Sequence, residues 1–145
     1  MGTAELTWKG GMRFEGLGAS GHVVTVDSSP DVGGADSAAR PMEVLLIGVM
    51  SCTAMDVMSI LRKKRQEPQD FKIIATFERS PEHPKKYTRI HLEYVAYGDV
   101  ELKALERAAE LSETTYCGAI ATVRGVAEVT RSCRVERMTE IAAAA

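Results

Sequence analysis

Three cysteines are the residues of this sequence whose chemistry can be weighed first, and they stand far apart in the chain. Cys52, Cys117 and Cys133 are too few and too widely spaced for a disulfide framework, and their number is odd. No CxxC pair occurs, and the histidines show no ligand spacing near them, so a structural zinc site is not expected. In a reducing compartment such thiols stay free, and a disulfide between two of them is more often transient chemistry than scaffold.

Cys133 and Cys117 differ in their local setting. Cys133 has the inward parity of a predicted strand, and free cysteine is among the most buried residue types, so a core side chain is favoured there. Cys117 stands at a joint, after one predicted helix and directly before Gly118. A thiol at the start of a helical turn gains from the free N–H groups there. For Cys117 a reactive and a buried role therefore stay open.

Cys52 lies inside a predicted helix. Its spacing from Val49 and Leu45 places it with core residues, which favours a packed thiol. Asp56, one turn later, is an acidic neighbour, so activation of this thiol would need a cation from elsewhere in the fold. Both a core and a reactive role stay open for Cys52 as well.

Strands and turns alternate in the first forty residues. β-Branched and aromatic residues bounded by glycine, proline and serine predict strands at residues 6–8, 12–14 and 22–26. The polar, Gly/Ala-rich residues 31–40 predict a loop. This part of the chain is expected to form hairpins.

Residues 41–65 have a helical and unusually apolar pattern. Pro41 suits the first turn of a helix, residues 44–50 are hydrophobic on all sides, and a basic cluster at residues 62–65 complements the helix dipole. The longest apolar run is far too short to cross a bilayer. The pattern predicts a central helix that is buried for most of its length and carries Cys52.

The second half of the sequence predicts two strands, a helix and a final strand. Residues 71–79 and 87–97 are typical of strands, and residues 100–114 of a helix with Asp99 as its N-cap. Residues 117–123 form a helix or a turn, and residues 126–138 alternate as a strand. Helices separated by antiparallel-type strands, rather than interleaved one to one, indicate the α+β class.

Composition and charge fit a single domain, residues 1–145. The chain is 45% hydrophobic and 26% charged, with a formal net charge of −2. It offers no basic excess to a phosphate backbone, so nucleic acid is not an expected partner. The first twenty residues lack the continuous apolar stretch of a secretory signal. The expected location is the cytoplasm, away from membranes.

Two segments resemble the OsmC/Ohr family, in its OsmC-like branch rather than the organic hydroperoxide resistance proteins proper. One is residues 40–46 (RPMEVLL), followed by residues 49–57 around Cys52 and residues 60–65; the other is residues 107–112 leading into Tyr116-Cys117. Strand and helix order agree over nearly the whole chain, and the paired cysteine contexts are fairly specific. The resemblance implies an α+β OsmC-like fold, with antiparallel sheets packed around a long central helix, and an intertwined homodimer with its sites at the interface.

The resemblance also implies roles for individual residues. Cys52 matches the peroxidatic cysteine of the family, and Cys117 matches the resolving one. Arg13 falls roughly where the family places the arginine that activates the thiolate, with a one-residue offset, and Arg40 is the alternative.

Two positions depart from the family pattern. The family's catalytic glutamate directly follows the helix-opening proline, where this chain has Met42, and the nearest carboxylate is Glu43. Glu43 precedes Cys52 by nine residues, about 13 Å along a helix at 1.5 Å per residue, so it cannot touch Cys52 within one chain. A carboxylate that positions the arginine near Cys52 would have to come from a second subunit, as the resemblance implies. Gly118 stands where the hydroperoxide-resistance members have proline. These departures bear on rate and preferred substrate, not on fold.

The resemblance therefore implies a thiol peroxidase that reduces organic hydroperoxides, and hydrogen peroxide as a further substrate. Its cycle would pass through a Cys52 sulfenate and a Cys52–Cys117 disulfide, which an external dithiol reduces. Lipoylated proteins are among the family's reductants, and no metal, haem or flavin is required. The alternative is a non-catalytic, dimeric binding or structural member of the same fold with packed thiols, which Met42, Gly118 and Asp56 favour.

Overall fold

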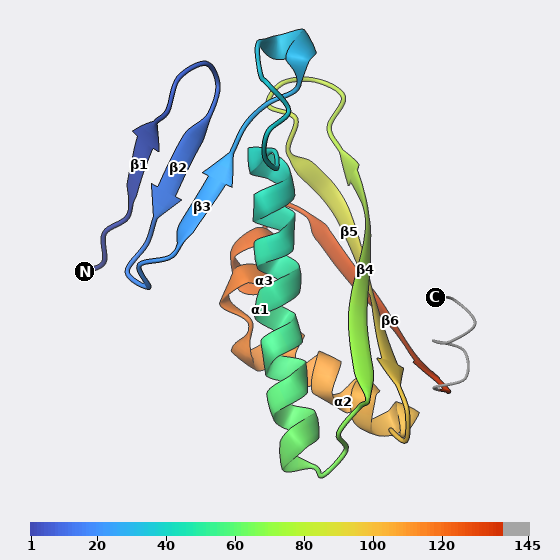
Figure 1. Cartoon of the computed structure of the whole chain (residues 1–145). Helices are drawn as coiled ribbons and strands as arrows, with labels where there is room; N and C mark the ends of the chain where they lie inside the picture. The colour runs from blue at the N-terminus through green and yellow to red at the C-terminus, as the bar shows by residue number, and fades with distance from the viewer. Residues whose placement is uncertain (138–145) are drawn as a thin grey trace. The chain divides into compact units, whose positions relative to one another are not determined.

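The computed structural model divides the chain into two compact units, Met1–Ile47 and Gly48–Ala145, and describes residues 1–137 (Figure 1). A 23-residue helix, α1 (Pro41–Lys63), begins in the first unit and ends in the second. The described residues form a mixed α+β structure with two three-stranded sheets. The α+β class is thereby confirmed, whereas the single domain over 1–145 stays a prediction.

The first unit contains an antiparallel sheet of three short strands. β1 (Glu5–Trp8), β2 (Phe14–Leu17) and β3 (Val23–Val26) follow one another in sequence and in space. The strand predicted at residues 12–14 begins only at Phe14, because the turn before it is wider than expected. Gly10 and Gly11 take φ values of 95° and 55°, and Arg13 donates its backbone N–H to Gly10 O.

A buried carboxylate organises the predicted loop that follows β3. Asp27 accepts hydrogen bonds from the N–H groups of Ser28, Ala35 and Ser37 and from the Ser37 hydroxyl. The Ser37 hydroxyl, followed by the backbone N–H groups, lowers the pKa of Asp27 to about 2. The loop also contains a short 3₁₀ turn, η1 (Pro30–Val32). Hydrogen bonds to the ionised Asp27 side chain, rather than packing of apolar side chains, thus hold this segment together.

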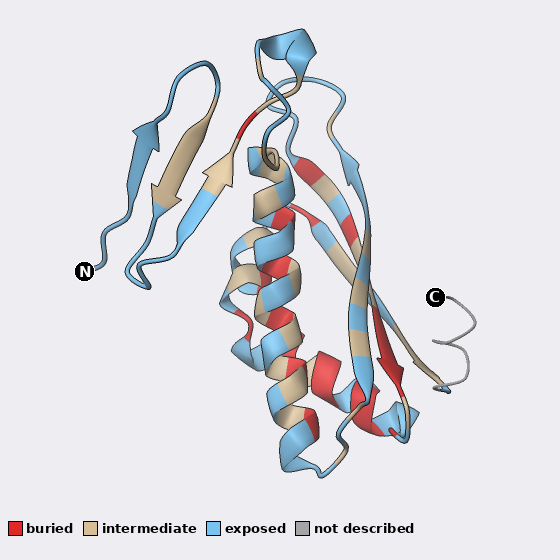
Figure 2. Ribbon diagram, in the orientation of Figure 1, coloured by how far each residue is buried: buried red, intermediate tan, exposed pale blue. Residues whose placement is uncertain are grey.

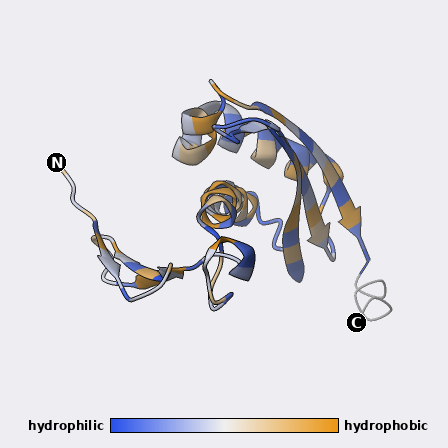
Figure 3. Ribbon diagram, turned by 90° about the horizontal axis from the view of Figure 1, so that it is seen from above, coloured by the Kyte–Doolittle hydropathy of each residue, from blue (hydrophilic) through white to orange (hydrophobic). Residues whose placement is uncertain are grey.

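Helix α1 buries only one narrow stripe of its surface. Val49, Thr53, Val57 and Leu61, each four residues apart, are almost fully buried (Figure 2). Other apolar side chains of the helix stay in solvent, at 47% for Leu45, 56% for Ile47 and 72% for Met55. The prediction of a helix buried for most of its length is therefore wrong for a single chain, because apolar residues lie around much of its circumference (Figure 3) and one chain covers one side.

By length and composition alone, α1 is the one helix among the described residues that could cross a membrane. Its most apolar 18-residue window has a mean hydropathy of 2.0, higher than the short run at residues 44–50 led us to expect. Long helices in the cores of globular proteins pass the same test, and 28% of this window is already buried. The buried stripe of α1 identifies one side of it as a packing surface.

The second unit is built on a mixed sheet in the order β4-β5-β6. β4 (Asp70–Arg79) and β5 (Tyr87–Tyr97) are antiparallel, whereas β6 (Glu128–Glu136) runs parallel to β5. The expectation of purely antiparallel sheets is wrong for this pair. Between β5 and β6 the chain passes through a helical crossover. A parallel pair requires such a crossover, because a tight hairpin reverses the chain and so joins only antiparallel strands.

One face of this sheet carries the core. On β5, Ile90, Leu92, Tyr94 and Ala96 are buried with the alternation that the sequence predicts, and near the end of the strand Val95 and Tyr97, of the opposite parity, are buried as well. Their parallel partners on β6 are Val129, Arg131, Cys133 and Val135. Cys133 therefore has the predicted inward parity, opposite Tyr94.

The crossover consists of α2 (Leu102–Leu111), a five-residue π-helix, η2 (Ser112–Tyr116), and α3 (Gly118–Val123). The predicted N-cap Asp99 is wrong. The N-cap is Glu101, because Gly98, with φ of 109°, and the Val100 N–H bond to Gly98 O extend the turn after β5. The predicted helix at residues 100–114 changes to the wider π-helix at Ser112. The segment predicted as helix or turn is a helix, and Cys117 is its N-cap.

Candidate functional site

The second unit brings two of the three cysteines together. Cys52 lies on α1 and is half-buried, whereas Cys117, at the joint between η2 and α3, is only 3% exposed. The two side chains are close enough for Cys52 to raise the pKa of Cys117, and both are free thiols. The two cysteines that the sequence pairs by resemblance are therefore neighbours in this structure.

The backbone holds the Cys117 thiol in place. Its Sγ accepts the Ile120 N–H at 3.3 Å, and its own N–H donates to Ser112 O at 2.8 Å. Burial raises the pKa of Cys117 to about 11, and the neighbouring Cys52 also raises it. The backbone N–H groups of Ile120 and Ala119 lower this pKa, but by less than burial raises it. These N–H groups act in the direction expected from sequence. Cys117 is therefore a protonated thiol at neutral pH.

The third cysteine has a separate environment on the sheet. Cys133 is half-buried on β6, opposite Tyr94. Burial raises its pKa to about 11, while Arg131 lowers it and Glu106 and Glu113 raise it. Burial outweighs the effect of Arg131, so the Cys133 thiol keeps its proton at neutral pH, which suits the core role predicted from its parity.

A chain of hydrogen-bonded hydroxyl groups runs through the interior beside the thiol pair. Thr53, directly after Cys52, lies 2.8 Å from the Tyr94 hydroxyl and 2.7 Å from Ser112 Oγ. The Ser112 hydroxyl donates to the Asp56 carboxylate at 2.9 Å. Asp56 is therefore bound to a neighbouring element and is not the unpaired carboxylate that the sequence suggested beside Cys52. Burial raises the pKa of Tyr94 well above its usual range, so this hydroxyl keeps its proton.

An ion pair between the buried Glu113 and the more exposed Arg131 continues the chain on the other side of Tyr94. Glu113, 7% exposed, lies 3.5 Å from the Tyr94 hydroxyl and accepts a 2.5 Å hydrogen bond from Arg131. The backbone carbonyl of Glu113 also accepts Nη2 of Arg124 at 2.6 Å. The first two residues of the π-helix are thus anchored to α1, to β5, to β6 and to the end of α3.

Reasoning from sequence missed this polar chain. One signal was present, since Arg131 has the same parity as Val129 and Cys133 and so places a charge on an apolar face. Its partner Glu113 had no comparable signal, because the predicted helix continued past it. Only the π-helix turns Glu113 inward.

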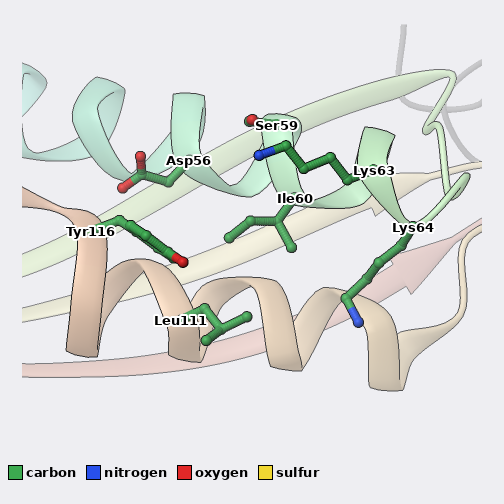
Figure 4. Close-up of a pocket in the computed structure, with 7 residues that line it drawn as sticks. All are labelled: Asp56, Ser59, Ile60, Lys63, Lys64, Leu111 and Tyr116. Atoms are coloured by element: carbon green, nitrogen blue, oxygen red, sulfur yellow. The ribbon is translucent and has the colours of Figure 1, made fainter.

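A pocket of about 370 Å³ lies between α1 and the segment formed by α2 and η2 (Figure 4). It is lined by Asp56, Ser59, Ile60, Lys63, Lys64, Leu111 and Tyr116. Asp56 and Tyr116 lie at one end, Lys63 and Lys64 at the other, and Ile60 and Leu111 between them. Neither Cys52 nor Cys117 lines this pocket, but two of its lining residues are near them in the chain, because Asp56 is one helical turn after Cys52 and Tyr116 directly precedes Cys117.

The other predicted site residues belong to the first unit. Nη1 of Arg13 donates to Ser37 Oγ at 2.8 Å, and Arg40 forms an ion pair with Asp36 at 2.7 Å. Glu43 accepts the backbone N–H of Arg40 at 3.0 Å, which caps α1 in the manner of a capping box. Roles for Arg13, Arg40 and Glu43 beside the thiols stay predictions.

Metal ligation has no visible support in the described part of the chain. Within residues 1–137, no group of three or more His, Cys, Asp and Glu side chains is placed to hold a metal ion. The chemistry that the site offers is that of two adjacent thiols, a chain of hydroxyls and a half-apolar pocket.

Known proteins share this architecture. The OsmC-like protein family matches residues 34–132, a range that includes both Cys52 and Cys117. Protein YhfA of Escherichia coli K12 is 35% identical over 133 residues, which cover 91% of this chain and 96% of that protein. A crystal structure of a hypothetical protein from Aquifex aeolicus VF5 is similar with a TM-score of 0.83 and 36% identity, covering 94% and 97% of the two chains.

A more distant structure carries a functional name. The organic hydroperoxide resistance protein OsmC of Legionella pneumophila has a TM-score of 0.66 and 14% identity, covering 93% of this chain and 97% of its own, a likeness of fold alone. The family match and the identity to YhfA confirm the resemblance that the two cysteine segments indicated. The chain belongs to the OsmC-like protein family.

Proposed function

We propose that the protein is a cysteine-dependent peroxidase that reduces organic hydroperoxides, with Cys52 as the peroxidatic and Cys117 as the resolving thiol. The observation that carries the proposal is that Cys52 of α1 and Cys117 at the joint between η2 and α3 are neighbours, close enough for Cys52 to raise the pKa of Cys117. Two thiols that meet in a folded protein can form a disulfide without a large rearrangement. Proteins of this fold that are named for organic hydroperoxide resistance support the same activity.

The chemistry balances with these two residues and an external reductant. The Cys52 thiolate attacks one oxygen of the hydroperoxide, the O–O bond breaks, and the leaving alkoxide takes a proton to become an alcohol. Cys52 is then a sulfenic acid. The Cys117 thiol attacks its sulfur, and the hydroxyl leaves as water with the proton that Cys117 loses. A dithiol, which a lipoylated protein could supply, reduces the resulting disulfide and restores both thiols.

The unequal burial of the two thiols supports this division of roles. Cys52 is half-buried and can meet a substrate, whereas Cys117 is 3% exposed and protonated. A thiol that stays protonated and covered is a poor first nucleophile, because the thiolate is the reactive form. It can still react with a sulfenic acid that forms beside it.

The pocket along α1 supports an organic rather than an inorganic peroxide. Ile60, Leu111 and Tyr116 line it with apolar surface, and Asp56, one helical turn after Cys52, lines it as well. An alkyl or aryl hydroperoxide can bury its own apolar surface there, whereas H₂O₂ cannot. We expect the second-order rate constant for cumene hydroperoxide to exceed that for H₂O₂.

A homodimer would complete the site. The exposed apolar residues of α1, Leu45, Ile47 and Met55, suit burial against a second copy, and such interfaces usually exceed about 2,000 Å². In this arrangement Arg13 or Arg40 stabilises the thiolate and the leaving oxygen, and Glu43 positions the arginine from the second subunit. Cytoplasmic location and the dithiol partner belong to the same proposal. Light scattering should give twice the mass of one chain at micromolar concentration.

Peroxide consumption by single-cysteine variants tests the function. One equivalent of cumene hydroperoxide should remove two titratable thiols from the wild-type protein. Cys52→Ser should consume no peroxide, and Cys117→Ser should complete one turnover and stop with a sulfenic acid at Cys52. Cys133→Ser is the matched control and should behave as the wild type. If no thiol is lost, the alternative of a binding or structural protein with packed thiols replaces this proposal.

A further inference from the structure

The π-helix before Cys117 is fixed by side chains that the peroxidase chemistry itself does not use. We infer that the Glu113–Arg131 ion pair and the Tyr94–Thr53–Ser112 hydroxyl chain are positioning elements that keep Cys117 beside Cys52 and so control disulfide formation. This inference rests on the proposed function, because it assigns these residues to the second of its two oxidation steps. It adds residues on β5, β6 and α2–η2 to a site that so far consisted of two thiols and a pocket.

A π-turn needs outside support to persist. π-Helices are rare and occur mostly as single turns, frequently at functional sites. Here the N–H of Cys117 reaches back to Ser112 O at 2.8 Å and closes the wide turn that ends at the thiol. The position of Cys117 therefore depends directly on the position of Ser112.

Ser112 is held by α1, the helix that carries Cys52. Its hydroxyl contacts Thr53 at 2.7 Å and Asp56 at 2.9 Å, and these residues lie one and four positions after Cys52. These contacts connect the two cysteines. Thr53 follows Cys52 in the chain, the Thr53 hydroxyl contacts the Ser112 hydroxyl, and Ser112 O accepts the N–H of Cys117.

Glu113 depends on Arg131 more than on Tyr94. The single phenolic proton of Tyr94 can serve only one of two contacts, and the Thr53 oxygen at 2.8 Å is closer than the Glu113 oxygen at 3.5 Å. Arg131, by contrast, donates a charge-assisted hydrogen bond to the Glu113 carboxylate. Ser112 is thus anchored to α1 and Glu113 to β6, so both ends of the first π-helical peptide are fixed.

Loss of the Glu113–Arg131 pair should weaken one oxidation step and spare the other. Oxidation of Cys52 by peroxide needs no contact with Cys117, whereas disulfide formation needs both sulfur atoms together. A π-helix freed from β6 would let Cys117 move away, and the Cys52 sulfenic acid would persist. In excess peroxide it would then proceed to the sulfinic acid.

The test uses the double variant Glu113→Gln/Arg131→Met, which removes both charges so that neither stays buried and unpaired. The matched control is Glu93→Gln/Arg134→Met, which removes the 3.0 Å ion pair between Glu93 of β5 and Arg134 of β6, together with the contact of Arg134 to Glu136. Arg134 has the opposite parity to Arg131 on β6. Both variants are made with Cys133→Ser. Glutathione redox buffers set the equilibrium, and alkylation with mass spectrometry gives the fraction of Cys52–Cys117 disulfide, with no peroxide present.

The double variant should weaken the disulfide equilibrium at least tenfold, about 30 mV for a two-electron couple, and the control should change it less than twofold. When peroxide is added to the Glu113→Gln/Arg131→Met variant, the rate of Cys52 oxidation should stay within twofold of the wild-type rate, while sulfinic acid accumulates at Cys52. Equal equilibria in the two variants would overturn the inference. Should the double variant fail to fold, Tyr94→Phe is measured in the same assay. We expect its Cys52–Cys117 disulfide equilibrium to weaken threefold or more, and an unchanged equilibrium would contradict the inference. A protein that forms the disulfide with glutathione but consumes no peroxide would refute the proposed function and leave this inference standing.

Discussion

Thr53→Val removes one buried hydroxyl and keeps nearly the same side-chain shape. Thr53 is fully buried, and its oxygen contacts Tyr94 at 2.8 Å and Ser112 at 2.7 Å. The variant loses both contacts, and each buried hydrogen bond contributes about 1 kcal/mol net. The added methyl group returns part of this, at most about 0.8 kcal/mol. We expect the free energy of unfolding to fall by about 1–2 kcal/mol.

Urea denaturation followed by circular dichroism measures this loss, because helix content reports on the second unit. Tryptophan fluorescence does not, since the single tryptophan, Trp8, belongs to the first unit. Thr88→Val is the control, because its hydroxyl makes a single exposed hydrogen bond, to Glu78 O at 3.2 Å. It should change stability by less than about 0.5 kcal/mol. A Thr53→Val protein as stable as the Thr88→Val protein would refute the view that this chain of hydroxyls holds α1 to the crossover.

Three further predictions concern acid, thiol titration and the helix cap. The folded pKa of Asp27, about 2, lies below its unfolded value of about 3.9, so the stability that its carboxylate gives is present above pH 4 and lost as the pH falls towards 2. Trp8 fluorescence should show this loss, and Asp27→Asn should remove that pH dependence. Alkylation of Cys117 by iodoacetamide should accelerate up to about pH 11, and a plateau near pH 8 would contradict the effect of burial. Glu43→Ala should lower stability by about 0.5–1 kcal/mol through loss of the capping hydrogen bond, with Glu43→Gln close to wild type in thermal unfolding.

The sequence predicts the elements of this protein better than their assembly. Strand β5 has the bounds that alternation predicts, and α1 begins at the expected proline, because both signals are local. The parallel pairing of β6 was missed, since parity places a side chain on a face and does not give the direction of the neighbouring strand. The exposed apolar side of α1 was missed for a similar reason, because hydrophobicity does not say whether the same chain covers an apolar side chain.

The site was predicted only in part. The proximity of Cys52 and Cys117 followed from a family resemblance, since nothing local relates one position to the other. The buried Glu113 could not be found from sequence, because the π-helix that turns it inward is stabilised by residues from three other elements. Buried polar networks depend on the exact geometry of several segments, which patterns of hydrophobicity do not record.

Peptide mapping of the oxidised protein tests the central claim most directly. The wild-type protein is treated with one equivalent of cumene hydroperoxide, its remaining thiols are alkylated, and disulfide-linked peptides are identified by mass spectrometry. The account predicts one intramolecular bridge, between Cys52 and Cys117, and an alkylated Cys133. A bridge that includes Cys133, or three alkylated cysteines after the peroxide has been added, would contradict it.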